Sequence, residues 1–298
     1  MATSVASTVP RTRASKPRRS WLLTVAVWTL VAYFMVPLVW LAINATKTNS
    51  DLFETFGLAF GDSFALFANV GNLLSYQDGI YIRWFGNTVL YSVVGAGGAA
   101  VFAALGGYAL AKYDFRGRRA LIATILGATA VPGTALAVPT YLLFAKVGLI
   151  NTEAAVIIPA LASPFGLFLM MVYAREAIPT ALIEAARIDG AGEFRVFWSI
   201  GMRLLTPAFV TVLLFQLVAT WNNYFLPLIV LNQSDKFPLT VGLSLWNSLA
   251  NAGGVNVAEP LYPLVITGSL LAVLPLCVAF FFLQRYWQSG MATGSVKE

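Results

Sequence analysis

Histidine is absent from this chain of 298 residues, and cysteine occurs once, at Cys277 inside an apolar run. Without histidine, a Ser/His/Asp triad, a Cys/His pair and the commonest zinc ligand are all excluded. A single cysteine rules out a disulfide within the chain. Charge is also scarce, since only 11% of residues are charged, against about a quarter in an ordinary soluble domain. The composition therefore excludes a soluble enzyme that relies on these catalytic sets.

The chain also lacks an energy source of its own. No Gly-Lys dipeptide occurs, so there is no P-loop, whose pattern G-x-x-x-x-G-K-[ST] holds nucleotide phosphates. Ion-driven transporters usually carry an ionisable side chain within a membrane span. Here Arg83, Lys146 and Glu153 lie only near the ends of apolar runs. Any work done by this chain would draw its energy from a partner.

Long apolar runs are what the sequence has in abundance. Hydrophobic residues make up 58% of the chain and the mean hydropathy is +0.75. Runs of about twenty apolar residues can cross a hydrocarbon core about 30 Å thick. The predicted fold class is an all-α polytopic membrane protein with six transmembrane helices. These spans are predicted at residues 21–43, 80–109, 120–145, 153–175, 207–231 and 261–284.

The segments on either side of the membrane domain (21–284) are polar. Residues 1–20 carry five basic side chains and no acidic one. Their Ser-, Thr- and Pro-rich composition cannot bury a core, so a disordered N-terminus is expected. The first apolar run is too long for a signal peptide and should remain as an uncleaved span. Residues 285–298 would form a C-terminal tail.

The distribution of basic residues orients the spans. Lys and Arg in excess mark the cytoplasmic side of a membrane protein. One side holds 15 of the 19 Lys and Arg residues if it comprises residues 1–20, 110–119, 175–206 and 285–298. Both termini are therefore predicted to be cytoplasmic. The net charge of +6 then reflects topology, and no nucleic-acid partner is expected.

Small residues repeat every four positions along the second predicted span. This small-residue stripe consists of Gly95, Ala99, Ala103 and Gly107. Small side chains allow two helix backbones to approach closely in lipid. The stripe fits packing inside this chain and equally fits a contact with another subunit.

One charged segment interrupts the apolar pattern, EAARIDGAGEFRVFW at residues 184–198. Pro179 suits the first turn of a helix, and the following residues are good helix formers. The run from Asp189 to Gly192 predicts a turn, because glycine adopts positive φ readily and aspartate favours turns. A second amphipathic helix is expected next. Its apolar face would comprise Phe194, Phe197, Ile200 and Leu204.

Two roles are open for this helical hairpin. It would lie in the lipid headgroup region if its arginines met anionic lipid. Alternatively, it would enter a groove of a soluble cytoplasmic partner, as amphipathic helices do in helix-in-groove recognition. Periodicity alone does not choose between these roles.

The segment resembles the EAA loop of bacterial ABC importer permeases. In that loop Glu-Ala-Ala is followed after three residues by Gly and after nine more by Ile, which correspond here to residues 184–186, Gly190 and Ile200. Over residues 20–297 the chain resembles the maltose-type carbohydrate permease subunits. The stretches that carry this resemblance are GYALAKYDFRG (107–117), VPTYLLFAKVGLINT (138–152), PALASPFGLFLM (159–170), WNNYFLPLI (221–229) and QRYWQSGMATGSVK (284–297).

The chain departs from this family just after Ile200. The family usually continues with x-Leu-Pro, whereas Met202 and Arg203 occupy the last two positions here, although Pro207 follows. The end of the second helix is therefore expected to differ in geometry.

The resemblance implies partners that supply the missing energy. In this family the EAA loop, within residues 176–206 here, is a coupling helix that docks in a cleft of a separate ATPase subunit. Two ATPases, which hold the ATP and Mg, move two similar permease subunits between inward- and outward-facing states. An extracytoplasmic binding protein delivers the sugar. The chain itself would bind no cofactor or metal and would lie among the lipids of the bacterial cytoplasmic membrane.

The resemblance also implies a role for each matched residue of the loop. Glu184 and Asp189 would make polar contacts with the ATPase, and Gly190 would form the turn. Ala185 and Ala186 would allow close approach. The other residues expected at this contact are Ala191, Phe194, Phe197 and Ile200.

Candidates for substrate contact lie in or near the fifth predicted span. Amides bond sugar hydroxyls, and aromatic rings pack on sugar C–H faces. The same residue types also suit structural roles, since Trp and Tyr mark the membrane interface and Asn bonds one helix to another. The candidates are Gln216, Trp221, Asn222, Asn223 and Tyr224. In the family, the long outer loop, residues 232–260 here, meets the binding protein.

The sequence thus leaves the particular sugar and the identity of the partner subunits open, but it predicts a class of function. The alternatives are a self-sufficient secondary transporter or channel, and an ABC permease for a solute other than sugar. The prediction is a permease subunit of an ATP-driven ABC importer for a sugar or oligosaccharide. Such a chain is a transport subunit and not an enzyme.

Overall fold

The computed structural model describes residues 20–252 and 260–293, with side chains as far as Tyr286. Within these ranges the chain is helical and contains no strand, which confirms the predicted all-α class. The element η3 is a π-helix, and the other η elements are short 3-10 helices. In chain order the elements are α1 (Trp21–Ala45), α2 (Asn49–Glu54), α3 (Leu66–Ser75), η1 (Tyr76–Gly79), α4 (Ile80–Lys112), α5 (Arg118–Thr129), η2 (Gly133–Leu136), α6 (Ala137–Lys146), α7 (Glu153–Ala160), α8 (Pro164–Ala177), α9 (Thr180–Ile188), α10 (Glu193–Val196), η3 (Phe197–Gly201), α11 (Met202–Trp221), α12 (Phe225–Val230), η4 (Ser234–Lys236), α13 (Leu239–Asn251) and α14 (Leu261–Thr293).

Five helical segments of the described chain are long and apolar enough to cross a membrane, and a sixth span exists if a bent pair is counted as one. This agrees with the predicted six spans. The five segments are Trp21–Ala45, Leu66–Lys112, Glu153–Ala177, Glu193–Trp221 and Leu261–Tyr286, and the pair is Arg118–Thr129 with Gly133–Lys146.

The bent pair shows why the third predicted span is not one straight helix. Its two halves meet at an angle of 99°. Pro132 lies at the bend, where it has no N–H to donate and disfavours the helical conformation of the residue before it. The chain therefore leaves α5 at Thr129 and starts again at Gly133.

The fifth span differs from its prediction at both ends. Composition suggested residues 207–231, but the helical rod begins at Glu193 and ends at Trp221. At the far end, the side-chain amide of Asn222 donates to the Val218 carbonyl (2.9 Å) and closes the helix. At the near end, α10, η3 and α11 run on without a break. The helix predicted after the turn is therefore present, but it is continuous with the fifth span, which begins 14 residues before its predicted start at residue 207.

Side chains that bond the backbone fix the starts of several helices. The Ser20 hydroxyl accepts from the Leu23 N–H (3.4 Å) at the start of α1. Thr152 does the same for α7, and Ser163 for α8, where Pro164 occupies the first turn. Such caps satisfy N–H groups that have no partner within the helix.

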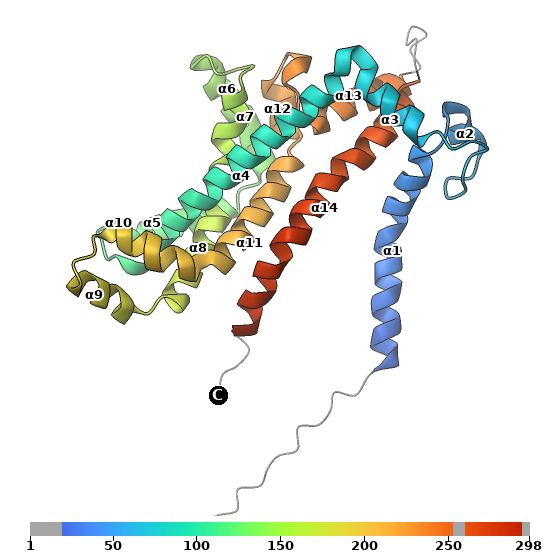
Figure 1. The fold of residues 1–298 in the computed structure, drawn as a ribbon. Coiled ribbons are helices and arrows are strands. Elements are labelled where there is room, and N and C mark those ends of the chain that lie inside the picture. The colour runs from blue at the N-terminus through green and yellow to red at the C-terminus, as the bar shows by residue number, and fades with distance from the viewer. Residues whose placement is uncertain (1–19, 253–259, 294–298) are drawn as a thin grey trace, which may run out of the picture.

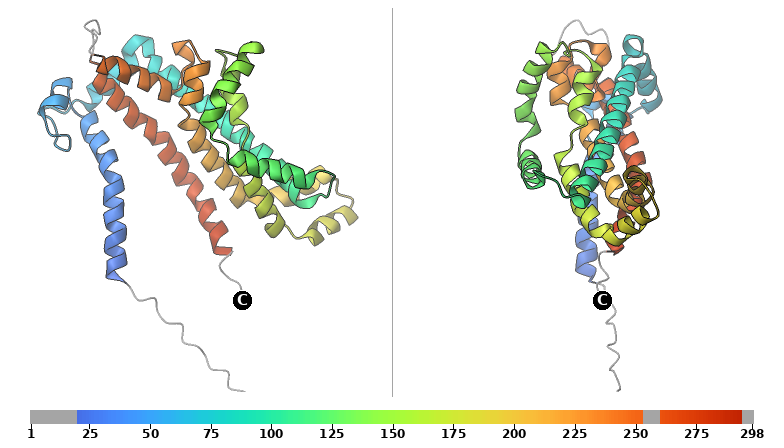
Figure 2. Two further views of the ribbon diagram at one scale, coloured as in Figure 1. Left: turned by 180° about the vertical axis from the view of Figure 1, so that it is seen from behind. Right: turned by 90° about the vertical axis from the view of Figure 1, so that its left-hand side faces the viewer.

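Helix α4 is the centre of the bundle and packs most extensively against α8 and α11 (Figures 1 and 2). All four residues of the small-residue stripe are buried at these contacts. A Cβ on Gly107 would lie 2.4 Å from the Met170 Cβ, and a Cβ on Gly95 would lie 2.8 Å from the Ala160 Cβ. Of the two interpretations left open by spacing, the stripe therefore serves packing inside this chain.

Two large apolar clusters fill the two ends of the bundle. One joins α4, α8, α9 and α11 through residues such as Tyr108, Met170 and Phe197. The other joins α3, α4, α13 and α14 around Trp84 and Trp246. The first cluster forms the base on which the charged segment rests.

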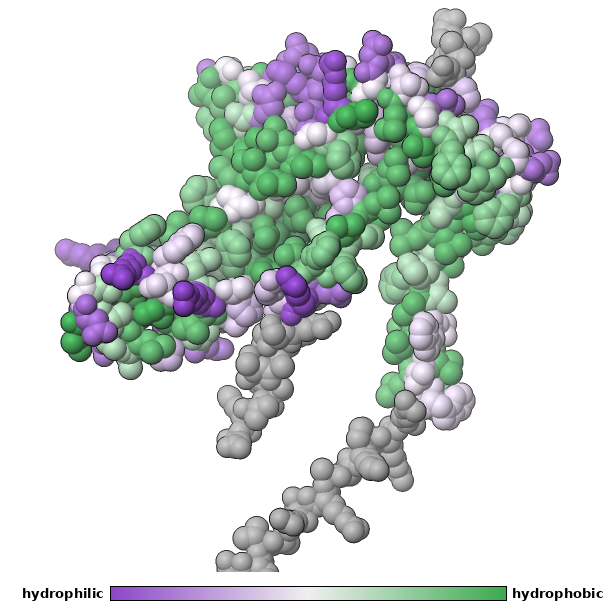
Figure 3. Space-filling view, in the orientation of Figure 1, coloured by the Kyte–Doolittle hydropathy of each residue, from purple (hydrophilic) through white to green (hydrophobic). Residues whose placement is uncertain are grey.

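Helix α1 stands apart from the rest of the bundle. None of its apolar window is buried, and its main neighbour is α14, from which it diverges toward Trp21 (Figures 1 and 2). The start of α1, the α9–α10 segment and the described end of α14 all lie at one end of the molecule (Figure 1). An apolar surface separates the polar surfaces at the two ends (Figure 3), as expected for a protein that crosses a bilayer.

Candidate functional site

The charged segment forms a helical hairpin, which we define as residues 180–198 and call the charged hairpin. Its first arm, α9, starts directly after Pro179 and ends at Ile188. Gly190 follows with a φ of +79°, a conformation that glycine adopts without steric cost. The Ala191 N–H then donates to the Ala186 carbonyl (2.9 Å) and closes the end of α9. The turn lies where the sequence predicts it.

A hydrogen-bonded clamp joins the two arms of the charged hairpin. The Arg187 guanidinium donates to both oxygens of Glu193, from Nε at 2.7 Å and from Nη2 at 3.1 Å. The Tyr113 hydroxyl donates to the same carboxylate. Tyr113 follows the last residue of α4, so the clamp also ties the charged hairpin to the central helix. We call these three residues the clamp.

The clamp keeps the same protonation state across the physiological pH range. Burial and the hydrogen bond to Glu193 raise the pKa of the Tyr113 phenol to about 12. The hydrogen bonds from Arg187 to Glu193 raise the pKa of the guanidinium above its already high value. Tyr113 and Arg187 therefore remain donors, and the arrangement is not built as a pH switch.

A second link joins the same elements beside the clamp. The Lys112 ammonium at the end of α4 donates to the Ile178 carbonyl (2.5 Å), just before α9. The charged hairpin is thus linked to the end of α4 just before its first arm, at Ile178, and at the start of its second arm, at Glu193. A force applied to the charged hairpin would reach α4 directly.

The outward face of the charged hairpin carries large apolar side chains. Ile188 is 87% exposed, Phe194 is 75% exposed and Trp198 is 59% exposed. The rings of Phe194 and Trp198 are stacked, with centroids 6.3 Å apart and planes 9° from parallel. Exposed apolar groups of this size mark an interaction surface. We call Ile188, Phe194 and Trp198 the apolar knob.

Predicted contact residues of the charged hairpin outside the apolar knob are also exposed. Glu184, Ala185 and Asp189 are exposed. Within the described part of the chain, neither carboxylate forms an ion pair. These groups are accessible to a partner.

The inward face of the charged hairpin is buried in the first apolar cluster. Ile183, Val196 and Phe197 are between 0% and 4% exposed. The Phe197 ring packs edge-on against Tyr108, with centroids 5.1 Å apart. The predicted contact residues Ala186, Ala191 and Ile200 are partly buried against the same cluster.

Phe194 and Phe197 therefore do not share a face, contrary to the predicted apolar stripe. Phe194 lies in the first turn after the charged hairpin's bend, where no other helix of the described chain covers it. Phe197 lies one turn later, above α4. Ile188 and Trp198 were not among the predicted contact residues, because helical periodicity does not distinguish an apolar residue that faces a partner from one that faces the core. Met202 and Arg203, which stand where the resembled family usually has Leu-Pro, directly follow the π-helix η3.

A second candidate site is a cavity of about 590 Å³ where three breaks between consecutive helices meet, which we call the break cavity. One interruption is the bend before Gly133, the second separates α7 from α8, and the third separates α11 from α12. Residues from both sides of every interruption line it. Its lining comprises Ala128, Val131, Gly133, Thr134, Leu136, Ala137, Thr140, Pro159, Ala160, Ala162, Pro164, Gln216, Ala219, Thr220, Asn223, Phe225 and Leu226.

Gln216 shows how the break cavity is built. Pro164 has no N–H, so the Ala160 carbonyl four residues earlier has no helical donor. The side-chain amide of Gln216 donates to that carbonyl instead (3.1 Å). Gln216 is also one of the residues that line the break cavity. A polar group within a membrane span is thus held in place by the interruption itself.

Only two of the five predicted substrate candidates, Gln216 and Asn223, line the break cavity. Trp221 is 7% exposed and donates from Nε1 to the Ala272 carbonyl (3.1 Å), so it packs α11 on α14. Asn222 closes α11. The Tyr224 hydroxyl lies 3.2 Å from the Ser244 hydroxyl. These three residues have structural roles in this conformation.

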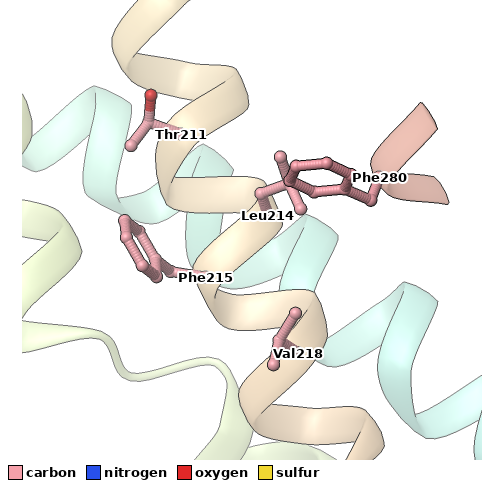
Figure 4. A pocket seen from close by; sticks show the side chains of 5 residues that line it. All are labelled: Thr211, Leu214, Phe215, Val218 and Phe280. Carbon is pink, nitrogen blue, oxygen red and sulfur yellow. The ribbon is translucent and has the colours of Figure 1, made fainter. Parts of the chain in front are cut away.

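A smaller cavity of about 200 Å³ lies between α11 and α14 (Figure 4). Its lining residues are Thr211, Leu214, Phe215, Val218 and Phe280. The only hydroxyl among them, that of Thr211, donates to the Pro207 carbonyl (2.8 Å). This cavity therefore lacks the polar groups that a hydrated solute needs.

A braced turn lies at the end of the molecule opposite the charged hairpin, within the predicted outer loop. Trp84, Asn87 and Tyr91 of α4 donate to backbone carbonyls of residues 234–237. The Asn151 side chain accepts from the N–H groups of residues 232 and 233. Residues 253–259 of the predicted outer loop lie outside the described residues. The described part presents a rigid polar turn.

Known proteins are similar to this chain in sequence and in fold. The family model described as "Binding-protein-dependent transport system inner membrane component" matches residues 12–293. The arabinooligosaccharides transport system permease protein AraQ of Halalkalibacterium halodurans is 33% identical over 286 residues, covering 96% of this chain and 99% of the relative. The lactose transport system permease protein LacG of Rhizobium radiobacter is 33% identical, covering 91% and 94%.

A solved structure supports the fold. The chain resembles one chain of a bacterial ABC transporter involved in the import of the acidic polysaccharide alginate, with a TM-score of 0.76. The two are 22% identical, and the match covers 94% of this chain and 100% of the other. The two chains therefore share a fold.

Proposed function

The chain belongs to the family of binding-protein-dependent transport system inner membrane components, and we propose that it is the permease subunit of an ATP-driven importer for a sugar or oligosaccharide. Membership makes it a multi-pass membrane protein and a transport subunit rather than an enzyme. It also implies partnership with an ATPase and a substrate-binding protein. The observation that carries the proposal is the charged hairpin, an exposed docking surface fixed to the central helix of the bundle.

The charged hairpin is proposed to receive mechanical work from the ATPase. The apolar knob would enter a cleft of the partner, while Glu184 and Asp189 would bond its polar rim. Helix-in-groove contacts of this kind bury apolar anchors at the centre. The clamp and the Lys112 contact would pass the resulting movement to α4. This assigns the hairpin to a protein partner in preference to the lipid headgroups.

The proposed assembly contains a second similar permease and two ATPase subunits, with ATP and Mg bound by the ATPases. The exposure of α1 supports the proposal of a second permease, because the chain's own bundle does not cover the apolar surface of this helix. Both termini and the charged hairpin would be cytoplasmic in a bacterial cytoplasmic membrane. The braced turn at the opposite end would then face the binding protein. Its rigidity suits a docking surface, because little order remains to be imposed on binding.

The break cavity is proposed as part of the substrate pathway. Interrupted helices expose backbone polar groups and side-chain amides at membrane depth, as transporter substrate sites require. Gln216 and Asn223 would hydrogen-bond sugar hydroxyls. The names of the relatives support sugar as the substrate class, since they include arabinooligosaccharides, lactose and melibiose/raffinose/stachyose transport.

Reconstitution tests the function. The chain would be placed in proteoliposomes with its second permease, its ATPase and its binding protein. ATP should drive uptake of a labelled oligosaccharide, and omission of the ATPase should abolish it. The alternative, a self-sufficient secondary transporter or channel, predicts uptake by this chain alone under an ion gradient. That result would overturn the proposal.

Substitution tests the pathway. Gln216→Leu should raise the half-saturating sugar concentration or lower the maximum uptake rate, because a polar contact in the break cavity is lost. Asn222→Ala, just outside the break cavity, is the matched control and should leave uptake close to normal. Equal uptake by Gln216→Leu, Asn223→Leu and the unmodified protein would remove the break cavity from the pathway while leaving the coupling proposal intact.

A further inference from the structure

A phenylalanine-rich loop projects from the end of α1 that lies opposite the charged hairpin. We call residues 46–67 the phenylalanine loop; it contains α2 and ends at the start of α3. Five of its phenylalanine side chains are between 62% and 81% exposed. They are Phe53, Phe56, Phe60, Phe64 and Phe67. Exposed aromatic groups gathered on one segment mark an interaction surface.

Buried polar side chains hold the phenylalanine loop in one shape. The Lys47 side chain is fully buried and its ammonium donates to the Phe56 carbonyl (3.0 Å). The Asn44 amide donates to the Gly57 carbonyl (2.8 Å), and the Asn69 amide donates to the Lys47 carbonyl (2.9 Å). The rings therefore project from a fixed backbone. A loop that merely lacked structure would not need these bonds.

The phenylalanine loop is held at the level of the end of α1. The Ala65 N–H donates to the Thr46 carbonyl (2.7 Å), so the loop returns to its starting point. Helix α1 has 25 residues, which gives a length of about 37 Å at about 1.5 Å per residue. The hydrocarbon core is about 30 Å thick. The end of α1, and the phenylalanine loop with it, therefore lies where hydrocarbon meets the headgroups.

The chemistry of the surface points to lipid as its occupant. The exposed charges of the phenylalanine loop are the acidic side chains of Glu54 and Asp62, whereas its one basic residue, Lys47, is buried. The apolar surface of α1 continues onto the loop (Figure 3). A surface that is continuous with a membrane-spanning helix meets the same solvent as that helix. Phenylalanine is one of the side chains that interfacial segments bury at the boundary between headgroups and acyl chains.

We propose that the phenylalanine loop is an interfacial anchor whose rings insert into the leaflet of the bilayer opposite the charged hairpin. The anchor fixes the depth of α1, whose apolar window the chain's own bundle leaves unburied. The inference depends on the membrane location of the chain and not on its substrate or its ATPase.

Site-directed spin labelling of the complete transporter in proteoliposomes tests the anchor. Cys277 is the only cysteine, so Cys277→Ser gives a background for single labels. Nitroxides would be attached to Phe60→Cys and Phe64→Cys, with Asp62→Cys as the matched control in the same loop. Collisions with oxygen, which concentrates in lipid, would be compared with collisions with a water-soluble nickel chelate.

The proposal predicts that labels at positions 60 and 64 collide preferentially with oxygen, and that the label at position 62 collides preferentially with nickel. Equal preference for nickel at all three positions would overturn it. Protection of positions 60 and 64 from both reagents, relieved when the second permease or the binding protein is omitted, would also overturn it by assigning a protein to this surface. Phe53 is left in place because its ring packs against Tyr262, with centroids 5.1 Å apart.

Discussion

Glycine serves opposite purposes in the small-residue stripe of α4 and in the turn of the charged hairpin. In the stripe, a Cβ added to Gly107 would meet the Met170 Cβ at 2.4 Å and the Met171 N at 2.8 Å. In the turn, a Cβ added to Gly190 would meet nothing within 4 Å, but the φ of that residue is +79°. Gly107 is needed in the stripe because there is no space for a side chain. Gly190 is needed in the turn because its positive φ is a backbone conformation that residues with a Cβ rarely adopt.

This difference distinguishes the tightly packed helices of the bundle from the charged hairpin, whose surface must remain exposed to a partner. The stripe lets α4 lie against α8 and α11 as one packed body. The turn brings the two arms of the charged hairpin together and presents the apolar knob outward. A rigid body with an exposed docking surface at one end is suited to transmit a partner's movement.

Gly107→Val should have the largest effect, because the new side chain would overlap the backbone of α8. Overpacking of a core typically costs roughly 1–3 kcal/mol and more when backbone must move. We expect a strongly reduced yield of folded protein and a lower thermal unfolding midpoint in detergent.

Gly97→Ala is the matched control for that change. Gly97 lies on the same helix, but a Cβ there would meet nothing within 4 Å. Its yield and unfolding midpoint should stay close to those of the unmodified protein. A normal midpoint for Gly107→Val would contradict the account of the stripe.

Gly190→Val should have an intermediate effect, which falls on coupling rather than on folding. A left-handed conformation costs a residue with a Cβ roughly 1–2 kcal/mol, or about a tenfold change in an equilibrium constant. The turn should distort while the bundle remains intact. We expect normal amounts of protein in the membrane and a severe loss of ATP-driven uptake.

Gly192→Ala sharpens the comparison within the same turn. Gly192 has a φ of −69° and open space around it. Uptake by this variant should be near normal. If both variants transport equally well, the conformation of Gly190 is not what shapes the docking surface.

Arg187→Gln, a change to the clamp, should have a smaller effect than Gly107→Val or Gly190→Val. Arg187→Gln removes the ion pair with Glu193, which is exposed and screened by water. We expect a partial loss of uptake with continued ATP hydrolysis, since the charged hairpin would dock but transmit movement poorly. The ratio of ATP hydrolysed to sugar imported measures this.

Exchange of the charges checks that interpretation. The double variant Arg187→Glu with Glu193→Arg should recover part of the lost coupling, and Tyr113→Phe, which removes the bond between the clamp and the end of α4, should also lower coupling. An unchanged ratio in Arg187→Gln would show that the clamp does not transmit movement.

The sequence predicted the elements that follow from local chemistry. The break between Asp189 and Gly192 and the apolar spans depend on neighbouring residues, and the structure has both. The stripe was visible at four-residue spacing, but only the packed helices show that it contacts α8 and α11 of the same chain.

Features that depend on distant neighbours could not be predicted in this way. Trp221 and Gln216 lie on the same span and both carry an N–H donor. Trp221 packs against α14 and donates to the Ala272 carbonyl. Gln216 donates to the Ala160 carbonyl, which Pro164 cannot bond because it has no N–H. Phe194 and Phe197 belong to the same apolar pattern in the sequence, but their surroundings differ. Phe197 packs against Tyr108 of α4, whereas Phe194 is exposed. The break cavity likewise unites three interruptions that lie far apart in sequence.

Cross-linking from the apolar knob tests the central claim most directly. Ile188→Cys, in a Cys277→Ser background, places one thiol at the most exposed apolar side chain of the charged hairpin. In the assembled transporter it should form a disulfide or short cross-link with a cysteine introduced into the cleft of the ATPase, and an outward-facing thiol at Phe67→Cys should not. A transporter that imports sugar with ATP but gives no link from position 188 to any cysteine of the ATPase surface would contradict the account.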